Sequence, residues 1–245
     1  MIMVKTHVDL VMVTYESALS LPTFFQSLRQ STKLPFRLLV IDNNSQDQSK
    51  AYLQSKAQDH FFRHKMQLVF NKKNLGVAKA WNQAVRMTSS RYIVFLNPDL
   101  KFTRDWLPKL IQSAARHKKA MVVGAKILNP DGSIYHAGAD GKIRGKGQKD
   151  RPGLLDQEKK VRWVQGSCFL VKREIFTKIG GFDEQFFMYG EEVDFCWRVR
   201  KAGYEVLYAP VPIYHYRQGA NITRKERLKL RQRSAQLLRA KWKKK

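Results

Sequence analysis

Two polar side chains around a proline, Asn97 and Asp99, directly follow an apolar run at residues 92–96. A short apolar run of this kind is typical of a buried strand. In an open α/β sheet, ligands bind outside the carboxyl ends of the strands. Carboxylate and amide oxygens at such a place suit a divalent cation and the phosphates that it holds. The segment therefore predicts a metal and phosphate site at a strand end.

Two earlier predicted strands also end in polar groups. One runs into Thr14, Tyr15 and Glu16, and the next runs into Asp42 and Asn43. A single ending of this type is common turn chemistry, because Asp and Asn hydrogen-bond to nearby backbone. Three such endings on neighbouring strands place several acceptors in one crevice. That arrangement suits a nucleotide, with amides and carboxylates for the base and ribose and one carboxylate for a metal on the phosphates.

The loop before the predicted helix at residues 76–87 is a further candidate ligand contact. Asn74 can cap the helix that follows, and Gly76 lets backbone approach a ligand closely.

A later helix is expected to begin with three carboxylates within four residues, Glu191, Glu192 and Asp194. Part of this cluster has a structural explanation, because a helix N-terminus favours negative charge. Asp194 can also pair with Arg198 one turn further on. Glu192 and Asp194 lie about 200° apart around a helix, so they are not expected to share one role. We expect one of them to face a cleft while the other braces the helix.

Strand-like and helix-like segments alternate through the first half of the chain. We expect strands at residues 8–13, 37–41, 66–70, 92–96 and 120–125, and helices at residues 19–29, 48–56, 76–87 and 106–117. Residues 129–162 are rich in Gly, Asp and Lys, which predicts hairpins and a basic loop. Beyond them we expect a strand at 163–171, helices at 172–179 and 190–202, and a last strand at 205–208. The alternation predicts an α/β fold with a mostly parallel central sheet flanked by helices.

The net charge of +26 on 245 residues is extreme for a chain that is 43% hydrophobic and therefore folded. It predicts an anionic partner: nucleic acid, acidic lipid or a phosphorylated substrate.

Cys168 and Cys196 have no metal-type spacing and are expected to be buried, reduced thiols. The first nine residues do not have the pattern of a signal peptide, and no run approaches about 18 apolar residues. We therefore expect a cytoplasmic protein, with attachment to a membrane surface left open.

The composition changes again at residues 224–245, which hold eleven basic residues and one acidic residue. Leu230, Leu237, Leu238 and Trp242 fall near one helical face. The segment is therefore a candidate basic amphipathic helix.

The chain resembles family 2 glycosyltransferases with the GT-A fold, and among them rhamnosyltransferase-like bacterial members. The matching segments are Val11-Met12-Val13-Thr14-Tyr15, Val40-Ile41-Asp42-Asn43-Asn44-Ser45, Asn74-Leu75-Gly76-Val77-Ala78, Phe95-Leu96-Asn97-Pro98-Asp99, Gly180-Gly181-Phe182-Asp183-Glu184-Gln185-Phe186-Phe187 and Gly190-Glu191-Glu192-Val193-Asp194. They occur in the family's order and cover roughly residues 8 to 216. The resemblance implies a catalytic domain at residues 1–221 and a basic amphipathic tail at residues 222–245.

The resemblance also implies roles for individual residues. The nucleotide site would be formed by Thr14, Tyr15, Glu16, Asp42, Asn74, Gly76 and Asn97, with Asp42 on the base. Asp99 would bind Mg²⁺ or Mn²⁺ bridging the donor's diphosphate, and Glu192 would be the catalytic base. His215, which by its own pattern is more often structural, would be an additional metal ligand. Asn97 stands where the family's Asp-x-Asp motif has its first Asp, and Glu192 where Asp is commoner.

The implied function is inverting, metal-dependent transfer of a sugar from a nucleotide-activated donor. A dTDP-rhamnose donor is the first expectation and a UDP-sugar is the alternative. The acceptor is expected to be a growing cell-surface glycan on a lipid carrier. The basic tail fits an anionic membrane surface, since Lys and Arg near an anionic leaflet gain about 1 kcal/mol each. The expected location is the inner face of the plasma membrane, with peripheral attachment.

Two other classes of function are weighed against this one. The net charge supports a nucleic-acid-binding protein, because neutralising phosphates gives sequence-independent affinity. However, acidic groups gather at the strand ends, and no RRM, KH, helix-turn-helix or zinc-finger signature occurs. Nucleic acid is therefore not an expected partner. The third class is a membrane-surface scaffold with a catalytically inactive transferase fold, which metal-dependent turnover would exclude.

Overall fold

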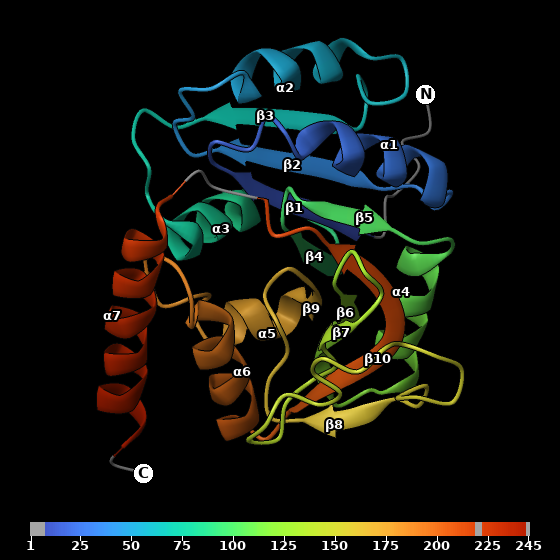
Figure 1. Cartoon of the computed structure of the whole chain (residues 1–245), viewed down its shortest axis with the longest axis vertical. Coiled ribbons are helices and arrows are strands. Elements are labelled where there is room, and N and C mark those ends of the chain that lie inside the picture. The colour runs from blue at the N-terminus through green and yellow to red at the C-terminus, as the bar shows by residue number, and fades with distance from the viewer. Residues whose placement is uncertain (1–7, 219–221, 244–245) are drawn as a thin grey trace.

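A mixed sheet of ten strands runs through the described part of the chain, with helices on both faces (Figure 1). The computed structural model describes residues 8–218 and 222–243. In spatial order the main strands are β3 (Met66–Phe70), β2 (Arg37–Asp42), β1 (Val8–Thr14), β4 (Tyr92–Leu96), β9 (Cys168–Lys172), β6 (Ala120–Leu128), β10 (Glu205–His215) and β5 (Leu100–Phe102). Two short strands lie off this path: β7 (Ile134–His136) pairs with β6, and β8 (Lys159–Val161) pairs with β10.

The strands β3, β2, β1 and β4 are parallel, which confirms the mostly parallel α/β sheet predicted from the sequence. β9 runs antiparallel between β4 and β6, so β6 and β10 point the same way as β4. The carboxyl ends of β1, β2, β4 and β10 consequently lie at one edge of the sheet. β10 is much longer than the predicted strand at residues 205–208 and reaches His215, with a register shift between Tyr208 and Pro212.

Helices cover both faces of the sheet in the described part of the chain (Figure 1). One face packs against α1 (Leu21–Ser31), α2 (Ser49–Gln58) and α4 (Trp106–Arg116). The other face packs against α3 (Val77–Arg86), α5 (Arg173–Lys178) and α6 (Glu191–Lys201). The seventh helix, α7 (Arg224–Trp242), lies beside α6.

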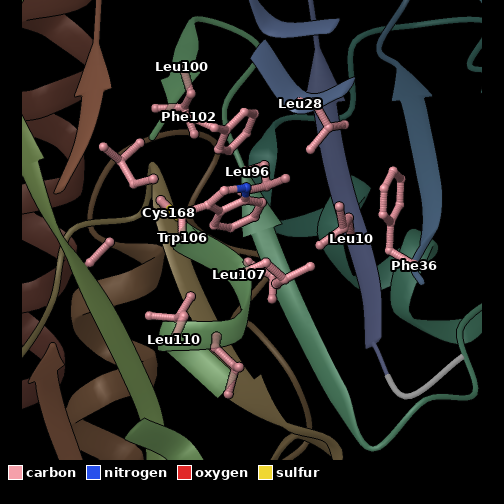
Figure 2. Close-up of a cluster of buried hydrophobic side chains, with 14 of the residues drawn as sticks. Leu10, Leu28, Phe36, Leu96, Leu100, Phe102, Trp106, Leu107, Leu110 and Cys168 are labelled. Atoms are coloured by element: carbon pink, nitrogen blue, oxygen red, sulfur yellow. The ribbon is translucent and has the colours of Figure 1, made fainter. Parts of the chain in front are cut away.

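The alternation of side chains along β1 explains why it is covered on both faces. Leu10 and Met12 belong to the core under α1 and α4, while Val11 belongs to the core under α3 and α6. Figure 2 shows Leu10 close to Leu28 of α1, with Trp106 of α4 in the same cluster. Each of these apolar side chains contributes about 1.5–3 kcal/mol when it is fully buried, so the strand order is held by packing on two sides.

The predicted C-terminal helix is present as α7, and it begins with a capping box between Thr223 and Glu226. Its apolar residues Leu237 and Leu238 pack against the core of the α3–α6 face. The Trp242 ring meets Trp197 edge-on, with ring centroids 5.4 Å apart. The apolar side of the helix is therefore covered by the protein itself. The predicted boundary at 221 adjoins residues 219–221, which lie outside the described residues.

Cys168 and Cys196 are buried and free, as predicted. Among the described residues, no helix combines the length and the apolar character needed to cross a bilayer.

A buried carboxylate fastens the start of β1 to its neighbours. Asp9 is fully buried and accepts hydrogen bonds from Arg37 Nε at 2.9 Å and from the backbone amides of Ser89 and Ser90 at 2.9 and 2.8 Å. Arg173 lies 3.7 Å from its other oxygen. One side chain therefore joins β2, the loop before β4 and the start of α5.

We predict that Asp9→Ala lowers the free energy of unfolding by about 3–5 kcal/mol, because it leaves a partly buried arginine and two backbone amides without their buried acceptor. Urea denaturation measures the loss. Glu205→Ala is the control, since Glu205 pairs with a Lys160 side chain that is 69% exposed and such pairs contribute less than about 1 kcal/mol. Equal losses in the two variants would contradict the structural role of Asp9.

Candidate active site

A cavity of about 190 Å³ opens at the edge where the strands end. Eight of the ten residues predicted from the sequence line it: Thr14, Tyr15, Asn74, Gly76, Asn97, Asp99, Glu192 and His215. The other two, Glu16 and Asp42, do not line it. Segments far apart in the chain therefore form one concave site, which is where ligand sites in proteins are most often found.

Asp99 and His215 are in direct polar contact in this site. His215 Nε2 lies 3.1 Å from Asp99 Oδ1, and the two side chains are 8% and 4% exposed, respectively. The backbone explains this proximity, because β5 pairs antiparallel with β10 and places Leu100 opposite His215. The backbone amide of Tyr216 also donates to the carbonyl of Asp99 at 2.9 Å. Asn97 lies at the same place, with its Nδ2 3.5 Å from His215 Nε2.

One wall of the cavity is built by a network of amides. Asn43 Nδ2 donates to Asn74 Oδ1 at 2.9 Å, and Asn43 Oδ1 accepts from the amide of Leu75 at 3.1 Å. Asn74 Oδ1 accepts from the amide of Gly76 at 2.9 Å, so it orders the loop rather than capping α3. These bonds tie the end of β2 to the loop before α3. The Thr14 hydroxyl on the same wall is buried without a hydrogen-bond partner among the described residues.

Asp42 and Glu16 lie beside this wall and brace its loops. Asp42 is fully buried, and its Oδ1 accepts from the amide of Ser45 at 3.0 Å. Its Oδ2 has no hydrogen-bond partner within the described residues. Glu16 Oε1 accepts from the amide of Gln46 at 2.7 Å, so it joins the loop after β1 to the loop after β2. Asp42 therefore keeps an unused acceptor close to the cavity.

The carboxylates at the start of α6 separate as expected from their positions around the helix. Glu191 and Glu192 line the cavity, whereas Asp194 is fully buried on another side. The predicted pair of Asp194 with Arg198 is confirmed, with 2.7 Å between Nε and Oδ2. The other Asp194 oxygen accepts from Trp242 Nε1 at 3.0 Å and lies 2.8 Å from Lys241 Nζ. Asp194 therefore attaches α7 to α6.

The electrostatics of the two remaining carboxyls distinguish them. Burial raises the pKa of Glu192, and hydrogen bonds from backbone amides, including that of Gly190 at 3.1 Å, oppose this rise. Burial raises the pKa of Glu191 further above its ordinary range, and the neighbouring charge of Glu192 adds to that rise. The rise in pKa is therefore larger for Glu191, because burial and the neighbouring charge of Glu192 both disfavour its charged form.

Several lining residues were not among the sequence-predicted ones. Asn43 stands in the polar turn after β2, so its position was visible in the sequence although its role was not. Tyr135 comes from β7, and Arg227 and Arg231 come from α7. No local pattern marks these three, because only the tertiary fold brings their segments to the strand ends.

Solved structures place the fold among the GT-A glycosyltransferases. The mannosyltransferase PcManGT from Pyrobaculum calidifontis, solved with GDP-Man and Mn²⁺, matches 95% of this chain and 61% of its own with a TM-score of 0.69 at 19% identity. GalNAc-T7, solved with UDP, GalNAc and Mn²⁺, matches 88% of this chain and 45% of its own, also with a TM-score of 0.69, at 15% identity. This chain spans less than two thirds of the length of either protein.

The sequence then identifies the family. The model of glycosyl transferase family 2 matches residues 9–180, and a model described as the N-terminal domain of galactosyltransferase matches residues 156–219. The N-acetylglucosaminyl-diphospho-decaprenol L-rhamnosyltransferase of Mycobacterium tuberculosis is 30% identical over 228 residues, covering 82% of this chain and 72% of that protein. The rhamnosyltransferase WbbL of Escherichia coli is 42% identical over 55 residues, which is 22% of this chain and 20% of that protein. The chain belongs to glycosyl transferase family 2.

Gly76 allows a test of how tightly the cavity wall is packed. A Cβ at Gly76 would lie 2.6 Å from the carbonyl oxygen of Phe187, and a Cβ at Gly132 would meet nothing within 4 Å, although both residues have φ of +80°. We predict that Gly76→Ala destabilises the protein by about 1–3 kcal/mol more than Gly132→Ala does, because only the former adds a clash to the backbone strain. Urea denaturation of both variants measures the difference, and equal losses would contradict this packing.

Proposed function

We propose that the chain transfers a sugar from a nucleotide diphosphate donor to a hydroxyl group of a glycan acceptor, with inversion at the anomeric carbon. The observation that carries the proposal is that the Asp99–His215 pair and the Glu192 carboxyl line one cavity. A candidate metal site and a candidate base then face the same reacting centre. Rhamnose is the proposed sugar, because the relative from Mycobacterium tuberculosis is named a rhamnosyltransferase. The proposed donor is dTDP-rhamnose, with a UDP-sugar as the alternative.

Asp99 and His215 would hold Mg²⁺ or Mn²⁺. Both residues line the cavity, and a carboxylate oxygen of Asp99 lies 3.1 Å from an imidazole nitrogen of His215. Across residues 8–218 and 222–243, no group of three His, Cys, Asp or Glu side chains forms a closed metal cage. This fits an ion that keeps water and substrate phosphates among its ligands. When bound, it would offset the negative charge that develops on the leaving nucleoside diphosphate.

Glu192 would be the general base. The acceptor hydroxyl has a very high pKa, so it must lose its proton as it attacks the anomeric carbon. The amide of Gly190 donates to Glu192 Oε2 and holds the carboxyl at the cavity. Attack from the side opposite the leaving diphosphate inverts the configuration of the sugar. Glu191 lines the cavity beside the base, and its raised pKa disfavours a second negative charge there.

The amide wall would hold the nucleotide. Thr14, Tyr15, Asn74 and Gly76 line the cavity on this side, and Asn97 lies beside His215 of the proposed metal site. Asp42 would accept an N–H of the base through Oδ2, the buried oxygen without a partner among the described residues. Glu16 would act on the nucleotide through the loop that it holds to Gln46.

The proposed acceptor is a cell-surface glycan attached through a diphosphate to a lipid carrier. This follows the relative, whose name specifies N-acetylglucosaminyl-diphospho-decaprenol. The outward side of α7 carries exposed basic residues, namely Lys225, Lys229, Arg233, Arg239 and Lys243. Each would gain about 1 kcal/mol near an anionic leaflet. A peripheral position on the inner face of the plasma membrane would bring the cavity to such an acceptor.

The nucleotide and metal assignment predicts a specific pattern of thermal stabilisation. We expect dTDP with Mn²⁺ at about 100 times its dissociation constant to stabilise the protein by about 2.7 kcal/mol. The part of this shift that depends on Mn²⁺ should be lost in Asp99→Asn and retained in Asp131→Asn, which alters an exposed carboxylate. If UDP stabilises the protein and dTDP does not, the alternative donor, a UDP-sugar, is favoured. Stabilisation by the nucleotide that does not depend on Mn²⁺ in the wild type, Asp99→Asn and Asp131→Asn would contradict the assignment.

The assignment of the base predicts different outcomes for the two adjacent glutamates. Glu192→Gln should lower kcat by about 10²–10⁴-fold, whereas Glu191→Gln leaves the proposed base in place and should retain most of the activity. Because Glu192 acts as the carboxylate and its pKa is raised from 4.5, wild-type kcat/KM should rise with pH through a pKa above that of an ordinary glutamate. Steady-state kinetics between pH 4 and about 9 tests both statements. An active Glu192→Gln variant would refute the assignment.

A further inference from the structure

Two arginines of α7 face into the cavity from outside the strand-end wall. Arg227 and Arg231 line the cavity and lie one helical turn apart, which corresponds to a rise of about 6 Å. Neither forms an ion pair with a carboxylate among residues 8–218 and 222–243. The Arg231 guanidinium lies over the Tyr189 ring, 5.0 Å from its centroid. Two cationic groups without an acidic partner are thus presented to a ligand.

The position of these arginines is set by the segment that carries the proposed base. Ser234 Oγ donates to the carbonyl of Met188 at 2.8 Å, and Lys241 pairs with Asp194 of α6 at 2.8 Å. Leu238 packs against Gly190, where an added Cβ would come within 3.0 Å of its Cδ1. The helix α7 and the start of α6 therefore form one packed unit. Arg227 and Arg231 keep a fixed relation to Glu192.

The two walls of the cavity then suit two different phosphate groups. Asp99 and His215 belong to the strand-end wall, where the donor's diphosphate is proposed to lie. Glu192 must contact the acceptor hydroxyl, so groups fastened to the same unit as Glu192 lie on the acceptor side. Arginine binds phosphate oxygens in a bidentate manner, and two arginines about 6 Å apart can serve two adjacent phosphates. Met188 and Ile222 line the cavity beside them and add apolar surface.

We propose that Arg227 and Arg231 bind the diphosphate of the acceptor, the group that joins its first sugar to the lipid. This inference rests on the proposed transferase function and assigns the recognition of the acceptor to α7. The helix would then be part of the substrate site in addition to any role at a membrane surface. A diphosphate of the donor would offer the same chemistry, and the experiment separates the two sources.

The test compares two acceptors with the full chain, dTDP-rhamnose and Mn²⁺. One acceptor is N-acetylglucosamine joined through a diphosphate to a short alkyl chain, and the other is the neutral alkyl glycoside of the same sugar. The double variant Arg227→Gln/Arg231→Gln should raise KM for the diphosphate acceptor by about tenfold or more, since charge-assisted hydrogen bonds are lost. It should leave kcat, KM for the neutral acceptor and stabilisation by dTDP unchanged. The matched control is Arg233→Gln/Arg239→Gln, which alters two exposed arginines of the same helix that do not line the cavity.

Three results for the Arg227→Gln/Arg231→Gln variant would overturn the inference. They are an unchanged KM for the diphosphate acceptor, an equal rise in KM for both acceptors, and a rise in KM for the donor alone. Calorimetry with the diphosphate acceptor separates this inference from the proposed function, because binding needs no turnover. If the wild type transfers sugar to neither acceptor, the proposed function fails. The arginine site stands in that case if the wild type and the control bind the diphosphate acceptor and the Arg227→Gln/Arg231→Gln variant does not.

Discussion

The antiparallel pairing of β5 with the end of β10 is the constraint on which the site depends. Asp99 follows β4 and His215 ends β10, and the strands β9 and β6 lie between β4 and β10 in the sheet. Without the pairing, the two residues would therefore be separated by two strands. The pairing turns the chain after β4 across these strands and brings the two side chains to 3.1 Å. The sheet can carry this crossing because its strand order is held by apolar packing on both faces. A candidate metal site thus follows from sheet topology.

Asp194 provides the second connection, between α6, which carries the proposed base, and the C-terminal helix α7. As a buried carboxylate it requires partners, and Arg198, Lys241 and Trp242 supply them. The same arrangement leaves Glu192 free to face the cavity from the opposite side of α6. Leu237, Leu238 and Trp242 of α7 then pack against the protein, and the basic residues of this helix divide between the cavity and the outer surface. The segment predicted from the sequence as a basic amphipathic tail therefore also lines the cavity.

Much of this site could be predicted from the sequence, because polar residues at strand ends are a local signal. Asn97 and Asp99 follow an apolar run, and Glu192 follows from its place at the start of a helix. The direction of each strand in the sheet was harder to predict, because the apolar pattern of β9 is the same whether the strand runs parallel or antiparallel to its neighbours. Tyr135 and Arg231 could not be predicted, because their place in the cavity depends on the packing of β7 and α7. Asp42 shows the converse: its type was informative, but burial hides it behind the cavity wall.

A metal site for a nucleotide diphosphate at the β5–β10 pairing can be observed in an anomalous difference map from crystals of the protein grown with dTDP and Mn²⁺. We expect a Mn²⁺ peak bound by Asp99 and His215, with the diphosphate on the same ion and the base directed toward Asp42. A nucleotide bound in the cavity with no Mn²⁺ between those two side chains, or with Mn²⁺ elsewhere, would contradict it.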